Sequence, residues 1–274
     1  MLDALQYEFM QNALLAGLLA SIACGIIGTL VVVNRIVFIS GGIAHAAYGG
    51  IGLAFFLGIS PLLGTIGFTL AVTAIIAAVM LTNKERSDAI IGVLWAVGMA
   101  IGVILIDITP GYNPDVMSFL FGSILAVPRA DIYLMIPLDI IIVFCVFFFY
   151  KDFLALSYDD EYAMLMGVPV KTFYTLLLIL IALSVVVIIR TVGLILVIAL
   201  LTIPPYIAEH RASSLRGMML ISIILNMIFT ALGLWISYVF NIKSGASIIM
   251  VAAFFFFVSL VMRSLKRKRI PVEE

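Results

Sequence analysis

Residues 13–33 read ALLAGLLASIACGIIGTLVVV, a run without a charged side chain. At a rise of 1.5 Å per residue, a helix of this length extends roughly 30 Å, which matches the hydrocarbon core of a bilayer. A helix also satisfies its backbone hydrogen bonds internally, as the bilayer interior requires. The run therefore predicts a membrane-spanning helix.

The composition of the whole chain points the same way. The 274 residues are 65% hydrophobic and 11% charged, whereas soluble domains are about 45–50% apolar and about 25% charged. The chain is therefore an integral membrane protein. Its formal net charge is zero, so no nucleic-acid partner is expected. Cys24 and Cys145 both fall inside apolar runs, which favours packing roles over a disulfide or a metal pair.

The fold predicted from these runs is an all-α, polytopic helical bundle that forms one transmembrane domain over residues 1–274. About nine spans are expected, within a range of eight to ten. They cover residues 12–33, 37–57, 62–81, 89–107, 132–150, 172–189, 193–208, 217–240 and 246–262. A further apolar piece at 116–127 is too short to cross, so we predict a re-entrant or half-helix there.

The basic residues orient these spans. If the basic tail, residues 263–274, is cytoplasmic, nine crossings place the N-terminus outside. Of the 15 Lys and Arg residues, only Arg129, Arg190 and Lys243 then fall in outside segments. This distribution satisfies the positive-inside rule at every inside turn.

Residues 40–52, SGGIAHAAYGGIG, place a histidine among glycines and alanines. His45 lies nine residues beyond Ile36, about 14 Å into the second span, and an ionisable residue at that depth indicates function. Imidazole is a borderline ligand for transition metals. Tyr48 faces the same way and is expected to donate to the ring or to line a pathway. The alternative is a histidine that is only hydrogen-bonded between helices. The small residues around it predict close approach by another helix.

Asp139 lies in the middle of the fifth predicted span, where a carboxylate is costly unless it is protonated, paired or in a cavity. One interpretation places it in the pathway, with His45 or a polar residue of another span as its partner. The other is a protonated or locally bonded aspartate.

The seventh span ends in LLTIPPYIAEH, residues 200–210. Pro204 and Pro205 remove two backbone donors, which predicts a kinked or broken helix, and broken helices in transporters line cavities. Thr202 and Tyr206, four residues apart, would meet a passing ion. The alternative is an ordinary helix end near the cytoplasm.

Asp107 and Asp115 bracket the predicted half-helix on the outer side, where two acids would attract a divalent cation. Asp115 has a second interpretation, because it is well placed to cap a helix that starts at Val116.

The link between the fifth and sixth spans, residues 151–171, contains a predicted short helix from Asp159 to Met166. Acidic residues at its start favour the helix dipole, and glycine and proline follow its end. Such a helix suits docking of a cytoplasmic partner, although an ordinary connecting turn has the same pattern. The docking residues assigned within segment 158–167 are Asp160, Glu161, Ala163, Met164, Met166 and Gly167.

Several stretches, in order over nearly the whole chain, carry a family resemblance. They are NRIVFISGGIAHAAYGGIGLA (34–54), SDAIIGVLWAVGMAIGVILI (87–106), PDVMSFLFGSILAV (114–127), YDDEYAMLMGVPV (158–170), VGLILVIALLTIPPYIAE (192–209) and SGASIIMVAAFFFF (244–257). With them the chain resembles the membrane permease subunit of ATP-binding-cassette importers for divalent metals, the zinc, manganese and iron uptake permeases of bacteria.

The resemblance implies a homodimer with the translocation pathway at its interface, surrounded by the lipids of a bacterial or archaeal cytoplasmic membrane. It implies a cytoplasmic ATPase dimer that docks on the coupling helix at 158–167, and an extracytoplasmic metal-binding protein. The transported zinc, manganese or iron is cargo, and no permanently bound cofactor is expected. No G-x-x-x-x-G-K-[ST] motif occurs in the chain, so ATP hydrolysis is expected only from the partner and the chain itself is not an enzyme.

One position departs from the family. The resemblance implies a G-D-x-x-x-H pattern, with a carboxylate four residues before the histidine, but Gly41 stands there. The acid that would share a helix face with the imidazole is therefore missing. Either the ligand set comes from elsewhere, or metal transit is weaker or differently selective.

Two other classes of protein compete with the importer subunit. A stand-alone secondary transporter or channel would need several intramembrane ions, and only His45 and Asp139 qualify. A membrane enzyme such as an intramembrane protease would need H-E-x-x-H, a Ser–His set or paired aspartates, none of which is evident.

Overall fold

The computed structural model describes residues 6–82, 87–110, 122 and 124–267, and every regular element in these ranges is helical. Within these ranges, eight helices are long and apolar enough to cross a membrane. They are α1 (Glu8–Val33), α2 (Val37–Leu57), α3 (Pro61–Thr82), α4 (Ser87–Ile108), α6 (Arg129–Phe148), α9 (Val170–Val192), α11 (Leu215–Phe240) and α12 (Ser244–Arg267).

A ninth apolar helix, α10 (Leu194–Glu209), has 16 residues and is only about 24 Å long. Each of the nine predicted runs therefore corresponds to one helix, and the all-α bundle is confirmed. The predicted half-helix at 116–127 lies mostly outside the described residues. Its described end is a single 3-10 turn, η3 (Ile124–Ala126).

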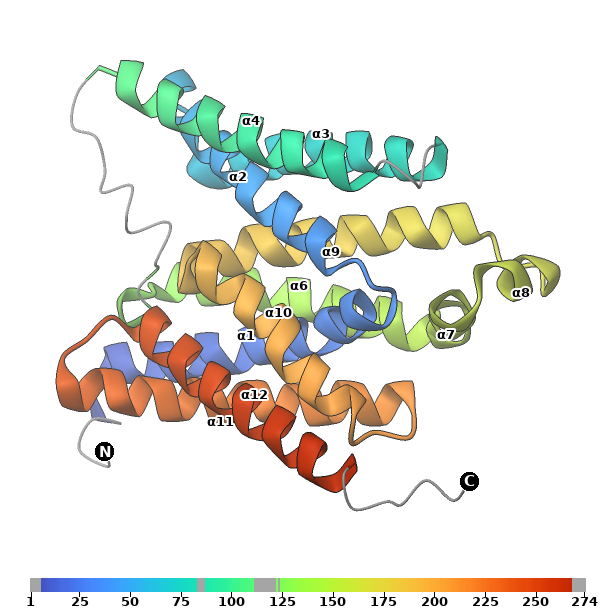
Figure 1. Ribbon diagram of the computed structural model, residues 1–274. Helices are drawn as coiled ribbons and strands as arrows, with labels where there is room; N and C mark the ends of the chain where they lie inside the picture. Colours follow the sequence, from blue (N-terminus) through green and yellow to red (C-terminus); the bar gives the residue numbers. More distant parts are fainter. Residues whose placement is uncertain (1–5, 83–86, 111–121, 123, 268–274) are drawn as a thin grey trace.

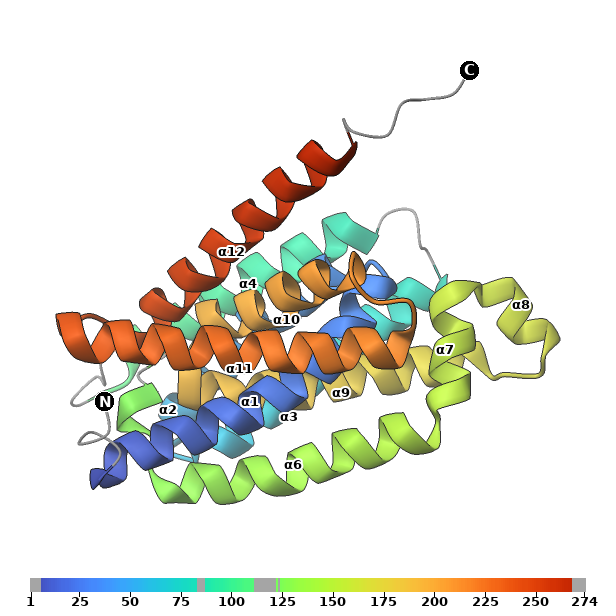
Figure 2. The same ribbon diagram turned by 90° about the horizontal axis from the view of Figure 1, so that it is seen from below.

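The described chain enters and leaves the bundle at opposite ends (Figure 1), as an odd number of crossings requires. Two short helices, α7 (Tyr150–Tyr158) and α8 (Asp160–Leu165), project beyond the C-terminal end of the bundle (Figure 2). The sequence predicted α8 but not α7, because residues 151–158 were assigned to the link between two spans.

Helix α1 is the centre of the larger part of the bundle and packs against α6, α9, α10 and α11. Its glycines admit these neighbours closely. A Cβ on Gly17 would lie 2.6 Å from Thr230 Cγ2, and one on Gly28 would lie 2.5 Å from the carbonyl oxygen of Leu201. Apolar side chains gain little free energy from leaving lipid, which is as apolar as they are. Close packing of the backbones instead stabilises the bundle through van der Waals contact.

Helices α2, α3 and α4 form a second group, in which α2 packs against both neighbours (Figure 1). A Cβ on Gly49 would lie 2.7 Å from the Gly98 carbonyl oxygen, and one on Gly50 would lie 2.6 Å from Thr65 Cα. The predicted close approach to the glycine-rich face of α2 is therefore confirmed.

Two ion pairs tie elements together at the end that holds the start of α1. Arg190 Nη2 lies 3.0 Å from Asp131 Oδ1, and Arg129 Nε lies 2.8 Å from Glu8 Oε1. The Asp131 side chain is 9% exposed, whereas the Glu8 side chain is 64% exposed. Only the first pair therefore compensates for the desolvation of a carboxylate.

Candidate functional site

His45 is the ninth residue of α2 and is half-buried against α4. Its ring stacks on the indole of Trp95, with centroids 3.9 Å apart and planes inclined by 26°. Nδ1 lies 2.9 Å from the carbonyl oxygen of Gly41. Because a carbonyl only accepts, the neutral ring carries its proton on Nδ1 and keeps a lone pair on Nε2. This is the nitrogen that is suited to bind a metal ion.

Gly41 lies one turn before His45 and leaves space beside it. A Cβ at Gly41 would meet no atom within 4 Å, whereas one at Gly42 would overlap Cγ2 of Ile91 on α4. The position where the family pattern expects an acid is therefore open rather than filled by a neighbouring side chain.

Trp95 was not identified from the sequence. It lies in α4, some fifty positions after the histidine, and no spacing rule connects residues on two different spans. The only available signal was its type, since the chain has two tryptophans and aromatic rings with a polar edge often contact other polar groups.

Tyr48 also faces α4, as predicted, but it does not bond to the imidazole. Its side chain is 2% exposed and packs with Ile51 and Ile106. The Tyr48 hydroxyl has no hydrogen-bond partner among the described residues, so any donation to the His45 ring is absent from this arrangement.

Asp139 is buried in α6, with 6% exposure, and its Oδ2 has no hydrogen-bond partner in the described part of the chain. Helix α6 packs against α1 and α9, whereas His45 faces α4. The structure thus does not pair Asp139 with His45, which was one of its predicted partners.

A kink or a break was predicted at Pro204 and Pro205, and the break is wrong, because α10 continues through both prolines to Glu209. Pro204 has no N–H to donate to the carbonyl of Leu200, and Asn226 Nδ2 of α11 donates to that oxygen instead, at 3.3 Å. The neighbouring helix thus replaces a lost backbone bond, as occurs around prolines in membrane helices. The interruption lies at Gly193, with φ 83° and ψ 161°, between α9 and α10.

Thr202 and Tyr206 lie one turn apart on α10, both half-buried. Thr202 Oγ1 donates to the carbonyl of Ile198 at 2.8 Å. The Tyr206 ring contacts the rings of His210 and Phe256, with centroids 5.0 and 5.3 Å away. The two site residues predicted on α10 lie in its C-terminal half, and no hydrogen bond among the described residues joins them to His45.

Asp107 lies in the last turn of α4 and is exposed. Asp115, the second acid assigned to the outer mouth, lies outside the described residues, so neither of its two interpretations is tested.

The short helix α8 begins with a side-chain cap. Asp159 Oδ1 accepts hydrogen bonds from the backbone N–H groups of Glu161 and Tyr162, at 2.8 and 3.1 Å. Acids in the first turn suit the dipole, and Gly167 follows with φ 79°. A short helix with this start and end is what the sequence predicted.

Helix α8 anchors one side chain and exposes several apolar ones. Ala163 is fully buried. Five large apolar side chains of α7, α8 and the residue after α8 are exposed: Tyr158 (75%), Tyr162 (56%), Met164 (57%), Leu165 (85%) and Met166 (65%). The sequence identified the two methionines but missed Leu165, which is the most exposed.

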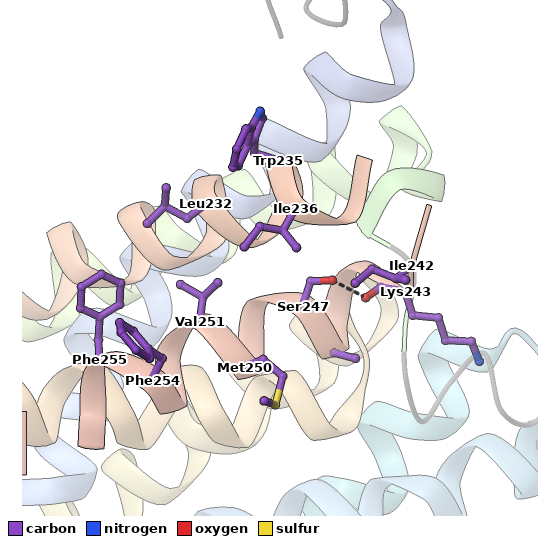
Figure 3. Close-up of a pocket in the computed structure, with 11 residues that line it drawn as sticks. Leu232, Trp235, Ile236, Ile242, Lys243, Ser247, Met250, Val251, Phe254 and Phe255 are labelled. Atoms are coloured by element: carbon purple, nitrogen blue, oxygen red, sulfur yellow. Dashed lines mark hydrogen bonds between the residues drawn. The ribbon is translucent and has the colours of Figure 1, made fainter. Parts of the chain in front are cut away.

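A groove with a volume of about 530 Å³ lies elsewhere, between α11 and α12 (Figure 3). Trp235, Met250 and Phe254 line it, and Ser247 Oγ donates to the Lys243 carbonyl oxygen at 3.0 Å. It contains no His, Cys, Asp or Glu, so its chemistry does not suit a metal ion. Among the described residues, no three His, Cys, Asp or Glu side chains cluster as a metal site.

Comparison with known proteins identifies the family. A model of the ABC 3 transport family matches residues 6–263. An uncharacterized membrane protein of Synechocystis is 51% identical, over 96% of this chain and 94% of the relative. The manganese import system permease protein ScaB of Streptococcus gordonii is 34% identical, over 96% and 95%. A solved structure of PsaBC from Streptococcus pneumoniae in complex with Fab superposes with a TM-score of 0.87 at 34% identity, covering 98% of both chains. The chain therefore belongs to the ABC 3 transport family and is an ATP-binding-cassette-type metal permease, as the sequence resemblance predicted.

Proposed function

We propose that this permease is the membrane subunit of an ATP-driven importer of a divalent transition metal, with manganese as the favoured ion among manganese, zinc and iron. The observation that carries the proposal is the projecting unit α7–α8 with its five exposed apolar side chains. A hydrophobic patch outside the spanning helices costs free energy unless a partner covers it. An ATP-driven permease whose own chain has no phosphate-binding motif needs a partner that hydrolyses ATP.

The patch suits a cytoplasmic ATPase. Asp159 caps α8 and the buried Ala163 fixes it against the bundle, so the helix presents Met164, Leu165 and Met166 in a defined direction. Methionine and leucine are adaptable apolar contacts for a groove on a partner. Helix α7 precedes α8 and α9 follows it. Movement of the ATPase would then reach the bundle through these two helices.

The charge distribution supports a cytoplasmic location for this end of the bundle and for the C-terminus. Arg35, Lys151, Lys171, Arg211 and Arg216 are exposed near it, and Arg263 follows in the last turns of α12. At the opposite end, Arg129 and Arg190 are paired with acids. The positive-inside rule therefore favours a cytoplasmic-membrane protein with this end and the C-terminus inside. On this orientation, we propose that an extracytoplasmic binding protein delivers the ion to the opposite end.

A second copy of the chain is proposed to complete the pathway along α4. This helix exposes a stripe of apolar residues at spacings of three and four, namely Val93, Val97, Ile101, Ile104 and Ile108. The stripe runs along the helix that also carries Trp95, so a homodimer joined there would place His45 near its interface.

His45 is proposed to line the pathway through its free Nε2, with backbone and hydroxyl oxygens as the remaining donors. Carbonyl and other oxygen ligands suit manganese, whereas imidazole suits zinc and iron. The name of ScaB favours manganese among these. Asp139, Thr202, Tyr206 and Asp107 remain proposed pathway or mouth residues.

The test is uptake by proteoliposomes that contain the permease with its ATPase and its binding protein. Uptake of Mn²⁺ is expected only with ATP, and excess Zn²⁺ or Fe²⁺ is expected to compete less well than Mn²⁺ itself. Uptake by the permease alone, driven by an ion gradient, would instead show a secondary transporter. Equal competition by all three ions would remove the manganese assignment but leave the importer.

A further inference from the structure

A second groove lies on the membrane-facing surface between α6 and α11, with α1 as its floor. Both helices pack against α1 (Figure 2), and Ile26 of α1 lines the groove. Its volume is about 250 Å³. The walls are apolar and come from Val143, Phe147, Met219, Leu220 and other side chains of the same kind.

The groove has a charged end at the cytoplasmic side. Arg216, the second residue of α11, lines it together with Tyr150, the first residue of α7. The guanidinium carbon of Arg216 lies 4.2 Å from the centroid of the Tyr150 ring. This cation–π contact holds the guanidinium over the mouth while leaving its N–H donors available. No lining residue is acidic.

The depth of the groove is defined by all three helices. Ile223 lies seven residues beyond Arg216, Val143 lies seven residues before Tyr150, and Ile26 lies seven residues before the end of α1. At 1.5 Å per residue, the apolar walls therefore reach about 10 Å into the bilayer from the charged end. An occupant must combine a negative head at the interface with an apolar chain directed inward.

We propose that this groove binds an anionic phospholipid of the cytoplasmic leaflet, with its phosphate on Arg216 and an acyl chain along Val143, Phe147 and Leu220. Arginine binds phosphate through two parallel N–H donors. Basic pockets between transmembrane helices on the cytoplasmic side recognise anionic lipid headgroups. Helix α6 leads into α7, and α11 follows the link after α10. A lipid in the groove would therefore contact both the start of α7 and the start of α11.

The experiment compares lipid retention by the purified full-length permease. Native mass spectrometry after equilibration with equal phosphatidylglycerol and phosphatidylcholine is expected to show phosphatidylglycerol retained severalfold more. Arg216→Gln is expected to abolish this preference. Arg211→Gln is the matched control. It removes the same charge, but Arg211 lies five residues before Arg216 and does not line the groove. Arg216→Lys should preserve part of the preference.

A second variant tests the acyl-chain half without changing charge. Val143→Trp fills the groove from a position that is 44% exposed, and it should lower retention of phosphatidylglycerol while Arg216 remains. Equal retention of both lipids by the unmodified permease, or an unchanged preference in Arg216→Gln, would overturn the proposal. So would cross-linking between copies through Leu220→Cys, in a background with Cys24 and Cys145 replaced by serine, since a second copy would then occupy the groove.

Discussion

The imidazole of His45 and the indole of Trp95 lie face to face, 3.9 Å apart, across the contact between α2 and α4. The stack fixes the ring plane while the Gly41 carbonyl fixes Nδ1. Two fixed contacts leave Nε2 in a defined direction, which is the preorganisation expected of a group that meets an ion in transit.

Replacing His45 with alanine is expected to lower ATP-dependent Mn²⁺ uptake by about tenfold, the lower end of the effect of disturbing a metal ligand or its support. Uptake into proteoliposomes that contain the complete transporter measures this. His210→Ala is the control, because His210 is exposed just beyond the last residue of α10. Equal uptake by His45→Ala and the unmodified permease would remove His45 from the pathway.

Adding a carboxylate at Gly41 tests the open space beside the imidazole. Gly41→Asp should fold, because its Cβ would meet nothing within 4 Å, and it should lower the Mn²⁺ concentration for half-maximal ATPase stimulation. Gly42→Asp is the matched control. Its Cβ would overlap Ile91, and overpacking of this kind costs about 1–3 kcal/mol. Similar thermal stability of the two variants would contradict the geometry of this face.

Replacing Leu165 with aspartate is expected to release the ATPase, since a charge would replace the most exposed apolar side chain of α8. Co-purification of the ATPase with the tagged permease measures the loss, and Met164→Asp with Met166→Asp should have the same effect. Leu165→Met keeps the apolar surface and should retain the partner. Asp159→Ala removes only the helix cap, at about 1 kcal/mol, and should weaken docking less. Unchanged recovery of the ATPase with Leu165→Asp would refute the docking role.

The ion pairs Arg190–Asp131 and Arg129–Glu8 should differ in their contribution to stability. Arg190→Ala leaves the buried Asp131 carboxylate without its partner, at an expected cost of roughly 1–3 kcal/mol. Arg129→Ala breaks a pair in which both side chains are more than half exposed, and such pairs contribute about 0–1 kcal/mol. Thermal unfolding in detergent compares them. A larger loss of stability for Arg129→Ala than for Arg190→Ala would show that burial does not determine which ion pair contributes more.

A double-mutant cycle tests the bond from Asn226 to the Leu200 carbonyl. Asn226→Leu leaves that oxygen without its donor and should destabilise the permease by about 1 kcal/mol. Pro204→Ala supplies a backbone N–H one turn away, so the double variant should recover part of the loss. Additive effects in thermal unfolding would mean that Asn226 does not compensate for the proline.

The spans were predictable because length and hydropathy are properties of a continuous segment. Each run of about twenty apolar residues became one helix, and even α10 was found despite its 16 residues. The close packing of α2 was also readable, because glycines at helical spacing show which face admits a neighbour.

The contacts between spans were not predictable. Lipid-facing and core-facing residues are equally apolar here, so periodicity does not reveal that Trp95 meets His45 or that Asn226 meets Leu200. The prolines illustrate the same limit. Their local chemistry indicates a kink or a break, and it does not reveal that Asn226 of α11 supplies a donor to the Leu200 carbonyl.

The glycine contacts of α2 have a mechanical consequence. Where backbone touches backbone, as at Gly49 with Gly98 and Gly50 with Thr65, no side chain is available to change rotamer and absorb sliding. Shear between packed helices depends on such adjustments. Helices α2, α3 and α4 therefore favour displacement as one rigid body, and the surfaces they share with α9 and α10 become the planes along which access to His45 would alternate.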